Sequence, residues 1–305
     1  MISSKVAKDM FSFFSPNIKP IQRNFNPAYL LDKSQQEQFE REGYVLIRDV
    51  YTKEEIDKII SFYNEIKTNK DFNVQSKFES SGNFSSIELQ NKIFQYIEHL
   101  MKNTAVRYAN LDNCEIGDGG AFFIKPNTEE SRLEPHQDST VIDESVSYGM
   151  FVWIPLIDIN ETNGALYVLP KSHLWGNHYR SQHITWAFKK SFKKLWKYMM
   201  PIYMNKGDIL IFDTSIIHAS EKNNSLSERI ALCGALLPKD HQKVDYLSAN
   251  KRIMQYLVDE NYWRDGGLAT SLSKYPYKII DNKFPKSINK YTLKKLVKES
   301  NNESI

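Results

Sequence analysis

The feature that most constrains the fold is a succession of short apolar segments in the middle of the chain. Between residues 106 and 237 these segments are rich in aromatic and β-branched residues, and Gly, Pro, Asn and Asp separate them. This composition is typical of β-strands bounded by turns. The predicted strands are VRYAN, AFFIKP, SYGMFVWIPLID, GALYVLP, GDILIF and RIALCGALL. They predict a mainly β sandwich or barrel.

Helices are predicted in front of these strands. Capping-box patterns, in which Ser or Thr is followed three residues later by Glu, begin at Ser34, Thr52 and Ser85. They predict helices over 35–42, 53–68 and 86–103, with a strand YVLIRDVY between the first two.

The remaining segments complete the predicted domain organisation. We expect a Pro-containing irregular arm over 1–33, and a single domain over 34–280. Within that domain we expect helices over 34–103, a β core over 104–238 with a helical insertion at 174–206, and an extension over 239–280. Residues 281–305 are rich in Lys and Asn and predict a frayed tail.

Within the insertion, residues 184–199 have apolar residues at helical spacing and five lysines between them. This pattern predicts a basic amphipathic helix that packs its apolar side on the sheet. A lid, a surface for an anionic substrate, and attachment to a membrane surface are the alternatives.

Overall charge and composition limit the classes of partner. The 40 basic and 37 acidic side chains leave a net charge of +3, which does not predict a nucleic-acid partner. We expect a small-molecule substrate. The two cysteines form no disulfide or zinc pattern, so a cytoplasmic location is expected. No segment predicts a secretory signal or a membrane-spanning helix, which needs about 18 apolar residues.

The segment EPHQDST contains the only His-x-Asp of the chain, at His136 and Asp138. On a strand, residues two apart lie on the same face, so the two side chains could share one metal ion. Taken alone the triplet equally fits a surface turn. A later predicted strand, however, leads to His218. Two imidazoles and one carboxylate suit iron(II) with open coordination positions, whereas a zinc hydrolase would favour HExxH.

Arg229 follows His218 by 11 residues, across a polar turn and onto the next predicted strand. From there its guanidinium could reach back into the barrel. The planar guanidinium suits the distal carboxylate of a co-substrate such as 2-oxoglutarate, and the hydroxyl of Ser220 could add a donor. A surface ion pair is the alternative for this arginine.

The chain resembles the phytanoyl-CoA dioxygenase family from about Phe39 to Leu237. The resemblance rests on five ordered pieces: FEREGYVLIRDV, PHQD, WIPL, NGALYVLPKSH and GDILIFDTSIIHASEKNNSLSERIAL. It implies a double-stranded β-helix core of the jelly-roll, cupin-like type. It also implies that His136, Asp138 and His218 bind iron(II), and that Arg229 and Ser220 bind 2-oxoglutarate.

The same resemblance implies lesser roles for other residues. Trp153 is expected as a wall of the co-substrate pocket and Lys125 near the mouth of the site, and Gln137 is a candidate for substrate contact. Family members often have glycine where this chain has Lys171. Because related halogenases replace the metal-binding carboxylate with a small residue, Asp138 indicates hydroxylation.

The predicted function is therefore that of an Fe(II)- and 2-oxoglutarate-dependent dioxygenase. It would use O2 to hydroxylate an unactivated C–H bond of a small molecule and release succinate and CO2. The five lysines of residues 184–199 suggest an anionic or carrier-linked substrate. A non-catalytic binding module and a redox-neutral zinc or nickel enzyme on the same fold are the alternatives, and desaturation or ring closure stays open.

Overall fold

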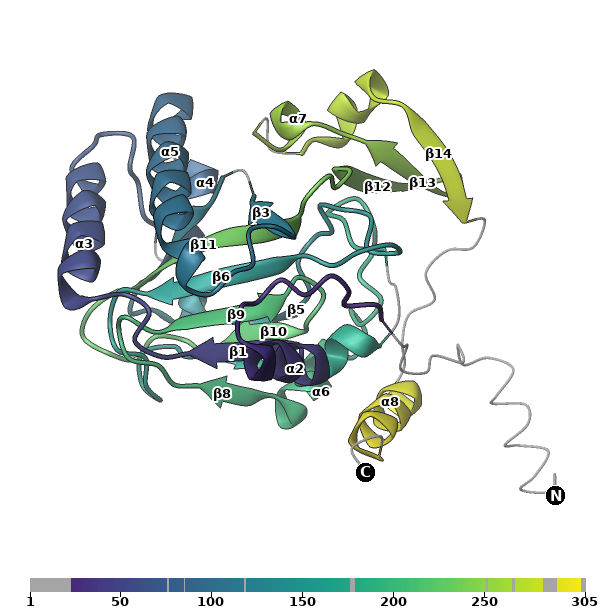
Figure 1. The fold of residues 1–305 in the computed structure, drawn as a ribbon, viewed down its shortest axis with the longest axis horizontal. Helices are drawn as coiled ribbons and strands as arrows, with labels where there is room; N and C mark the ends of the chain where they lie inside the picture. The colour runs from purple at the N-terminus through teal and green to yellow at the C-terminus, as the bar shows by residue number, and fades with distance from the viewer. Residues whose placement is uncertain are drawn as a thin grey trace.

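The computed structural model describes residues 23–75, 77–84, 86–117, 119–175, 179–250, 252–264, 267–281 and 290–302. Two antiparallel sheets, one of seven strands and one of four, form the core, and a separate three-stranded sheet follows them in the chain (Figure 1). The predicted mainly β fold, a double-stranded β-helix with added helices, is confirmed.

The larger sheet has the strand order β1-β9-β6-β11-β4-β2, with β3 paired to β11. Its strands are β1 (Tyr44–Ile47), β9 (Ile209–Asp213), β6 (Met150–Pro155), β11 (Arg229–Pro238), β4 (Ala121–Lys125), β2 (Glu79–Ser80) and β3 (Cys114–Ile116). The smaller sheet consists of β5 (Leu133–His136), β10 (His218–Ser220), β7 (Leu166–Val168) and β8 (Met200–Ile202). The C-terminal sheet consists of β12 (Val244–Ala249), β13 (Arg252–Leu257) and β14 (Tyr277–Asp281).

Side chains alternate across the larger sheet, so its two faces serve different purposes. On β6, Val152 and Ile154 pack into one apolar cluster with the N-terminal helices, whereas Phe151 and Trp153 pack into a second cluster with residues of β9 and β11. This second face is the inner face of the β-helix. A site on the inner face is therefore built on rigid, hydrogen-bonded strands.

Three long helices confirm the helical prediction: α2 (Lys33–Glu42), α3 (Lys53–Lys67) and α5 (Ile87–Thr104). The predicted capping box of Thr52 and Glu55 is present in full. The other two caps differ from the prediction. The Asp32 carboxylate accepts from the Gln35 N–H and caps α2, and Ser86 caps α5. A carboxylate or hydroxyl one or two residues away satisfies the same helix-end N–H groups, so the pattern gives the helix but not its cap.

The remaining short helices are α4 (Ser81–Phe84), α6 (Phe192–Leu195) and α7 (Glu260–Arg264), and 3-10 turns occur at Ala105–Arg107, Glu129–Ser131, Ser172–Leu174, Trp196–Tyr198 and Ala269–Lys274. The prediction of a strand at VRYAN is wrong, because the 3-10 turn continues α5 there and the ring of Tyr108 is buried.

The prediction of one basic helix over 184–199 is also wrong. Only α6 and the 3-10 turn after it are helical, and residues before α6 form turns. The aromatic side chains have separate partners: the indole N–H of Trp186 donates to Gln137, and that of Trp196 donates to Glu134. Because the lysines share no continuous helix face, the suggestion of an anionic substrate loses its basis.

Part of the predicted frayed tail is a packed helix, α8 (Lys290–Asn302), whose Leu293 and Leu296 are buried. The indole N–H of Trp175 donates to the Ser300 hydroxyl at 2.9 Å. Lys171, which stands where relatives often have glycine, has a φ of 64° and donates to the Ser300 carbonyl at 3.2 Å. The left-handed backbone explains a preference for glycine at this position. The lysine side chain, in turn, binds α8.

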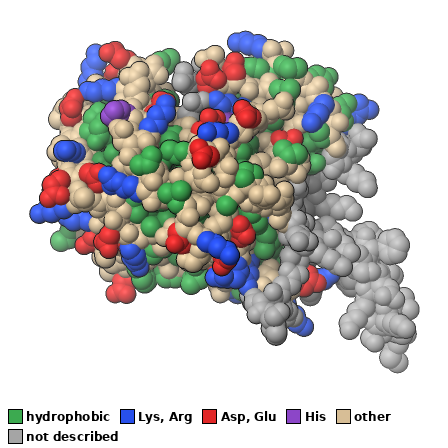
Figure 2. Space-filling model, viewed as in Figure 1, with side chains coloured by type: hydrophobic (Ala, Val, Ile, Leu, Met, Phe, Trp, Pro, Cys, Tyr) green, Lys and Arg blue, Asp and Glu red, His purple; other side chains and the backbone are tan. Residues whose placement is uncertain are grey.

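Of the predicted N-terminal arm, residues 1–22 lie outside the described part, and Tyr29 and Leu30 pack into the core. On the face in Figure 2, acidic and basic side chains are interspersed over the coloured residues. This distribution agrees with the small net charge. Every helix in the described ranges is too short or too polar to span a bilayer.

Candidate metal centre and co-substrate pocket

The two predicted histidine ligands lie directly opposite one another on paired strands of the smaller sheet. His136 ends β5, His218 begins β10, and their ring centroids are 4.3 Å apart. Asp138 follows β5 by two residues, and its two carboxylate oxygens lie 3.7 Å from His136 Nε2 and 3.5 Å from His218 Nε2. One ligand atom from each residue lies within 4.8 Å of the others. The structure thus brings the three residues together as the sequence predicted.

Backbone carbonyls orient both imidazole rings. His136 Nδ1 lies 2.8 Å from the Glu134 carbonyl, and His218 Nδ1 lies 3.1 Å from the Ile216 carbonyl. In each case Nδ1–H donates to the carbonyl, so Nε2 is the nitrogen left to bind a metal ion. Burial, with the neighbouring His218, lowers the pKa of His136 to about 4. Two neutral imidazoles and one carboxylate form the donor set that non-haem iron(II) takes.

The three residues open onto a cavity of about 170 Å³ that Arg229, Trp153 and Ser220 also line. The Arg229 side chain is buried, and its guanidinium carbon lies 5.3 Å from the centroid of the Trp153 ring. Its Nε has no acceptor among the described residues, and burial lowers its pKa to about 9. A buried guanidinium without a carboxylate partner is the group that an anionic ligand would complete.

Lys125 was expected near the mouth of the site, and this prediction is wrong. Its side chain is fully buried opposite Arg229 on the neighbouring strand β4, and Nζ donates to the carbonyls of Ser131 and Glu221. It does not line the cavity. Gly164, at a φ of 79°, provides the space, because a Cβ there would lie 2.4 Å from Lys125 Cδ.

Gln137 also has a different use from the one predicted. Its side-chain amide N–H donates to the Ser215 carbonyl, and its amide oxygen accepts from the Trp186 indole N–H. Both polar atoms therefore have partners within the protein. Alternation along the strand turns it away from the face of His136 and Asp138. The structure therefore does not favour a substrate contact for Gln137.

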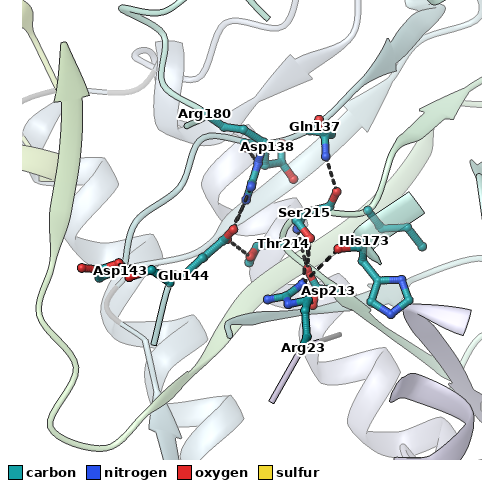
Figure 3. A network of polar contacts seen from close by, with 12 residues as sticks. Arg23, Gln137, Asp138, Asp143, Glu144, His173, Arg180, Asp213, Thr214 and Ser215 are labelled. Atoms are coloured by element: carbon teal, nitrogen blue, oxygen red, sulfur yellow. Dashed lines mark hydrogen bonds and ion pairs between the residues drawn. The ribbon is translucent and has the colours of Figure 1, made fainter. Parts of the chain in front are cut away.

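A buried polar network supports the segment that carries Asp138, and sequence analysis missed it (Figure 3). Arg180 Nε donates to the backbone carbonyl of Asp138 at 2.9 Å. The two terminal nitrogens of Arg180 bind both oxygens of Glu144 at 2.7 and 2.6 Å, and Glu144 also accepts from Thr214. This ion pair fixes the backbone position of the metal-site carboxylate. No local pattern links Arg180 to Glu144 in the sequence.

A second ion pair of the network, between Arg23 and Asp213, lies at the end of β9, the strand that precedes His218. Arg23 donates to Asp213 at 2.7 Å and to the Ser215 hydroxyl at 3.0 Å. Burial would raise the pKa of Asp213, but Arg23 and His173 outweigh it and the pKa is lowered. His173 is buried, and its Nε2 lies 3.0 Å from the Glu40 carbonyl.

The chain is similar in sequence to known proteins. A family profile described as phytanoyl-CoA dioxygenase (PhyH) matches residues 39–231. Phytanoyl-CoA dioxygenase 1 from Oryza sativa subsp. japonica is 31% identical over 122 residues, which cover 36% of this chain and 41% of that protein. The match therefore spans well under two thirds of the length of the rice protein.

Solved structures with the same fold include EctD from S. alaskensis, crystallised with 2-oxoglutarate and 5-hydroxyectoine. Its TM-score is 0.52 at 14% identity, over 74% of this chain and 85% of that one. The epimerase SnoN in complex with Fe3+, alpha ketoglutarate and nogalamycin RO has a TM-score of 0.51 at 14% identity, over 69% and 85% of the two chains. At this identity the similarity supports the fold alone. The profile, however, covers more than half of the chain and includes His136, Asp138, His218 and Arg229. The chain therefore belongs to the phytanoyl-CoA dioxygenase family.

Proposed function

We propose that this protein is an Fe(II)- and 2-oxoglutarate-dependent dioxygenase that hydroxylates a small-molecule substrate. One observation carries the proposal: the His136, Asp138 and His218 cluster and the unpaired guanidinium of Arg229 open onto the same cavity. A metal-binding face and an anion-binding group within one small pocket are what a chelating dicarboxylate requires. Family membership gives the same expectation.

In this proposal His136, Asp138 and His218 hold iron(II) through two imidazole Nε2 atoms and a carboxylate oxygen. Three ligands leave positions for 2-oxoglutarate and dioxygen. With these bound, the iron would supply the oxidation, in which 2-oxoglutarate becomes succinate and CO2. Arg229 would bind the distal carboxylate of 2-oxoglutarate, with the Ser220 hydroxyl as an additional donor.

The charges of the pocket favour binding of this co-substrate before oxygen is used. Asp138 would neutralise one of the two charges of a bound iron(II) ion, and Arg229 has no acidic partner among the described residues. A dicarboxylate satisfies both sites at once. The apolar rings of Trp153 and Phe212 line the cavity and lower the local dielectric constant, which strengthens these electrostatic contacts.

Hydroxylation is favoured over halogenation because a carboxylate is the third ligand. The Asp138 carboxylate lies between the two histidines, and Arg180 fixes its backbone. A halogenating site would need that position open for chloride.

The test is succinate formation from 2-oxoglutarate by purified protein under air, with iron(II) and ascorbate. Asp138→Ala and His218→Ala should each lower turnover at least about 100-fold, because changes in residues that only support metal ligands already lower activity 10- to 100-fold. His99→Ala is the matched control, because His99 is exposed on α5, away from the cavity. Turnover retained in both ligand variants, or unaffected by an iron chelator, would reject the proposal.

A further inference from the structure

A second cavity, of about 220 Å³, is lined by residues of the larger sheet and α5 and by residues that follow the β core, among them two of α7. Phe151 of β6 and Ala235 of β11 form its floor, and Phe94 of α5 and Val141 form two of its sides. Trp263 of α7 lines it from the C-terminal unit, residues 239–281. Figure 1 shows this unit beside the end of the larger sheet that carries β3, with α7 extending toward α5.

This cavity continues the inner face of the β-helix beyond the metal pocket. Phe151 and Trp153 are two residues apart on β6 and face the same side, opposite Ala235 and Cys233 of β11. Trp153 lines the metal pocket and Phe151 lines the second cavity. The ring of Phe212 lies 5.7 Å from Phe151 and 5.2 Å from His218. A pair of phenyl rings therefore separates the second cavity from the metal pocket.

The walls of the cavity define what it could bind. They are mostly apolar, and a charged pair, Lys243 and Glu260 at 3.7 Å, lies on one side. The indole N–H of Trp263 is buried and has no acceptor among the described residues. A cavity of about 150 Å³ is enough to bind benzene, so this one could hold an apolar group of about six to ten carbon atoms, from one aromatic ring to two fused rings. A hydroxyl or carbonyl oxygen on that group would satisfy the indole.

The contribution of the C-terminal unit lies outside the part of the chain that matches the family profile. Lys243, Glu260 and Trp263 all follow residue 231, where the match to the family profile ends. The unit is attached to the core by backbone pairing of Lys243 with Ile142, four residues after Asp138. Family membership therefore does not determine this wall of the cavity.

We infer that this cavity is the substrate subsite for a compact apolar group carrying one hydrogen-bond acceptor, and that the C-terminal unit determines its specificity. The inference rests on the proposed oxygenase function. The group would sit on the far side of Phe151, and the remainder of the substrate would extend past Phe212 to the metal pocket. Trp263 and Ala235 are specificity-determining residues in this arrangement.

The test uses 2-naphthol and naphthalene as probes, titrated into the full-length protein by calorimetry with iron(II) and 2-oxoglutarate under nitrogen. Wild type should bind 2-naphthol saturably. Ala235→Phe and Val141→Trp each fill the cavity and should weaken binding at least about tenfold, whereas Ala269→Phe, the same enlargement as the first at an exposed position, should not. Trp263→Phe should weaken 2-naphthol binding severalfold and leave naphthalene binding unchanged.

Two further measurements separate this inference from the proposed function. Binding of 2-oxoglutarate should be unchanged in all four variants, and 2-naphthol should alter the rate of succinate formation in wild type but not in the filled variants. Probe binding that filling does not weaken, or no saturable binding to wild type, would overturn the subsite. Probe binding without any effect on succinate formation would also overturn it, because the cavity would then be separate from the active site. Absence of 2-oxoglutarate binding and turnover in wild type would instead reject the proposed function.

Discussion

Two groups of buried charge lie near the metal cluster, and they are built differently. In the supporting network, Arg180 binds both oxygens of Glu144, and Arg23 binds Asp213 (Figure 3). In the pocket, Arg229 has no carboxylate partner among the described residues, although it is as deeply buried. Both groups therefore carry the desolvation penalty of a buried guanidinium, but only the network offsets it within the protein.

The difference distinguishes arginines that position the metal site from an arginine that would bind a ligand. A buried charge is tolerated when an opposite charge and hydrogen bonds complete it. Arg180 is complete in the folded chain and positions Asp138, and Arg23 has a carboxylate partner in Asp213, at the end of the strand before His218, although its second terminal nitrogen has no acceptor among the described residues. Arg229 is incomplete, so an anion from outside would complete it. The two groups should respond in opposite ways to loss of their arginine.

The largest effect is expected for Arg180→Met. It leaves the Glu144 carboxylate buried without its partner, so the free energy of unfolding should fall by about 3–5 kcal/mol. Urea unfolding of the metal-free protein measures this. Arg180→Met combined with Glu144→Leu removes both charges and should recover most of the loss. A double variant as unstable as the single one would show that packing, and not the unpaired charge, is responsible.

The double variant also tests the positioning role of the pair. Because Arg180 Nε donates to the Asp138 carbonyl, a stable double variant should still bind iron(II) about 10- to 100-fold more weakly. Iron affinity equal to that of wild type would mean that the Asp138 segment keeps its position without Arg180.

Arg229→Met should change the free energy of unfolding in the opposite direction. It removes an uncompensated buried cation, so the ligand-free protein should become more stable by roughly 1–3 kcal/mol. The variant should also lose stabilisation by 2-oxoglutarate, which for wild type would be about 2.7 kcal/mol at 100 times the dissociation constant. Thermal unfolding with and without 2-oxoglutarate measures both effects. Destabilisation of the ligand-free variant would contradict the comparison.

Lys125 sharpens the comparison, because it is a further buried basic side chain. Its burial favours the neutral amine over the charged ammonium group. Burial and, secondarily, Arg229 lower its pKa to about 6. Between that value and the ordinary lysine pKa of about 10.4, the unfolded chain binds one more proton than the folded chain. Stability should therefore rise with pH in this window, by up to about 1.4 kcal/mol per pH unit.

The measurement is urea unfolding of wild type and Lys125→Met at pH 7 and pH 8. The free energy of unfolding of wild type minus that of Lys125→Met should be larger at pH 8 than at pH 7. Lys67→Met, at an exposed lysine, is the control and should show no such change. Parallel pH profiles for wild type and Lys125→Met would mean that Lys125 stays charged in the fold.

Much of the fold and the metal cluster was predictable because the signals are local. The strand segments carry their own turn residues, and His136 and Asp138 are only two residues apart, at the end of β5 and just after it. His218 and Arg229 lie on consecutive strands, so their spacing was informative. Local signals also misled where tertiary partners decide the conformation: residues 184–199 have helical spacing, yet Trp186 and Trp196 bind different parts of the core.

The rest depends on contacts between distant residues. Arg180 and Glu144 are separated by 36 residues, and neither belongs to a motif. The direction of the Lys125 side chain depends on the space that Gly164 leaves, 39 positions later in the chain. The strands of the C-terminal unit gave no distinct signal, although this unit forms one wall of the second cavity.

The smallest effect is expected for Arg107→Met, and it isolates burial as the deciding factor. Arg107 binds both oxygens of Glu55 at 2.9 and 2.6 Å, the same bidentate geometry as Arg180 and Glu144. The Arg107 side chain, however, is 40% exposed, whereas that of Arg180 is 3% exposed. Water solvates both groups when the pair is broken, so the loss should stay below about 1 kcal/mol. It should also shrink in 1 M salt, which screens exposed charges, whereas the Arg180→Met loss should not. Equal losses for the two variants would show that bidentate geometry, and not burial, determines the penalty, and the contrast between Arg180 and Arg229 would then need another explanation.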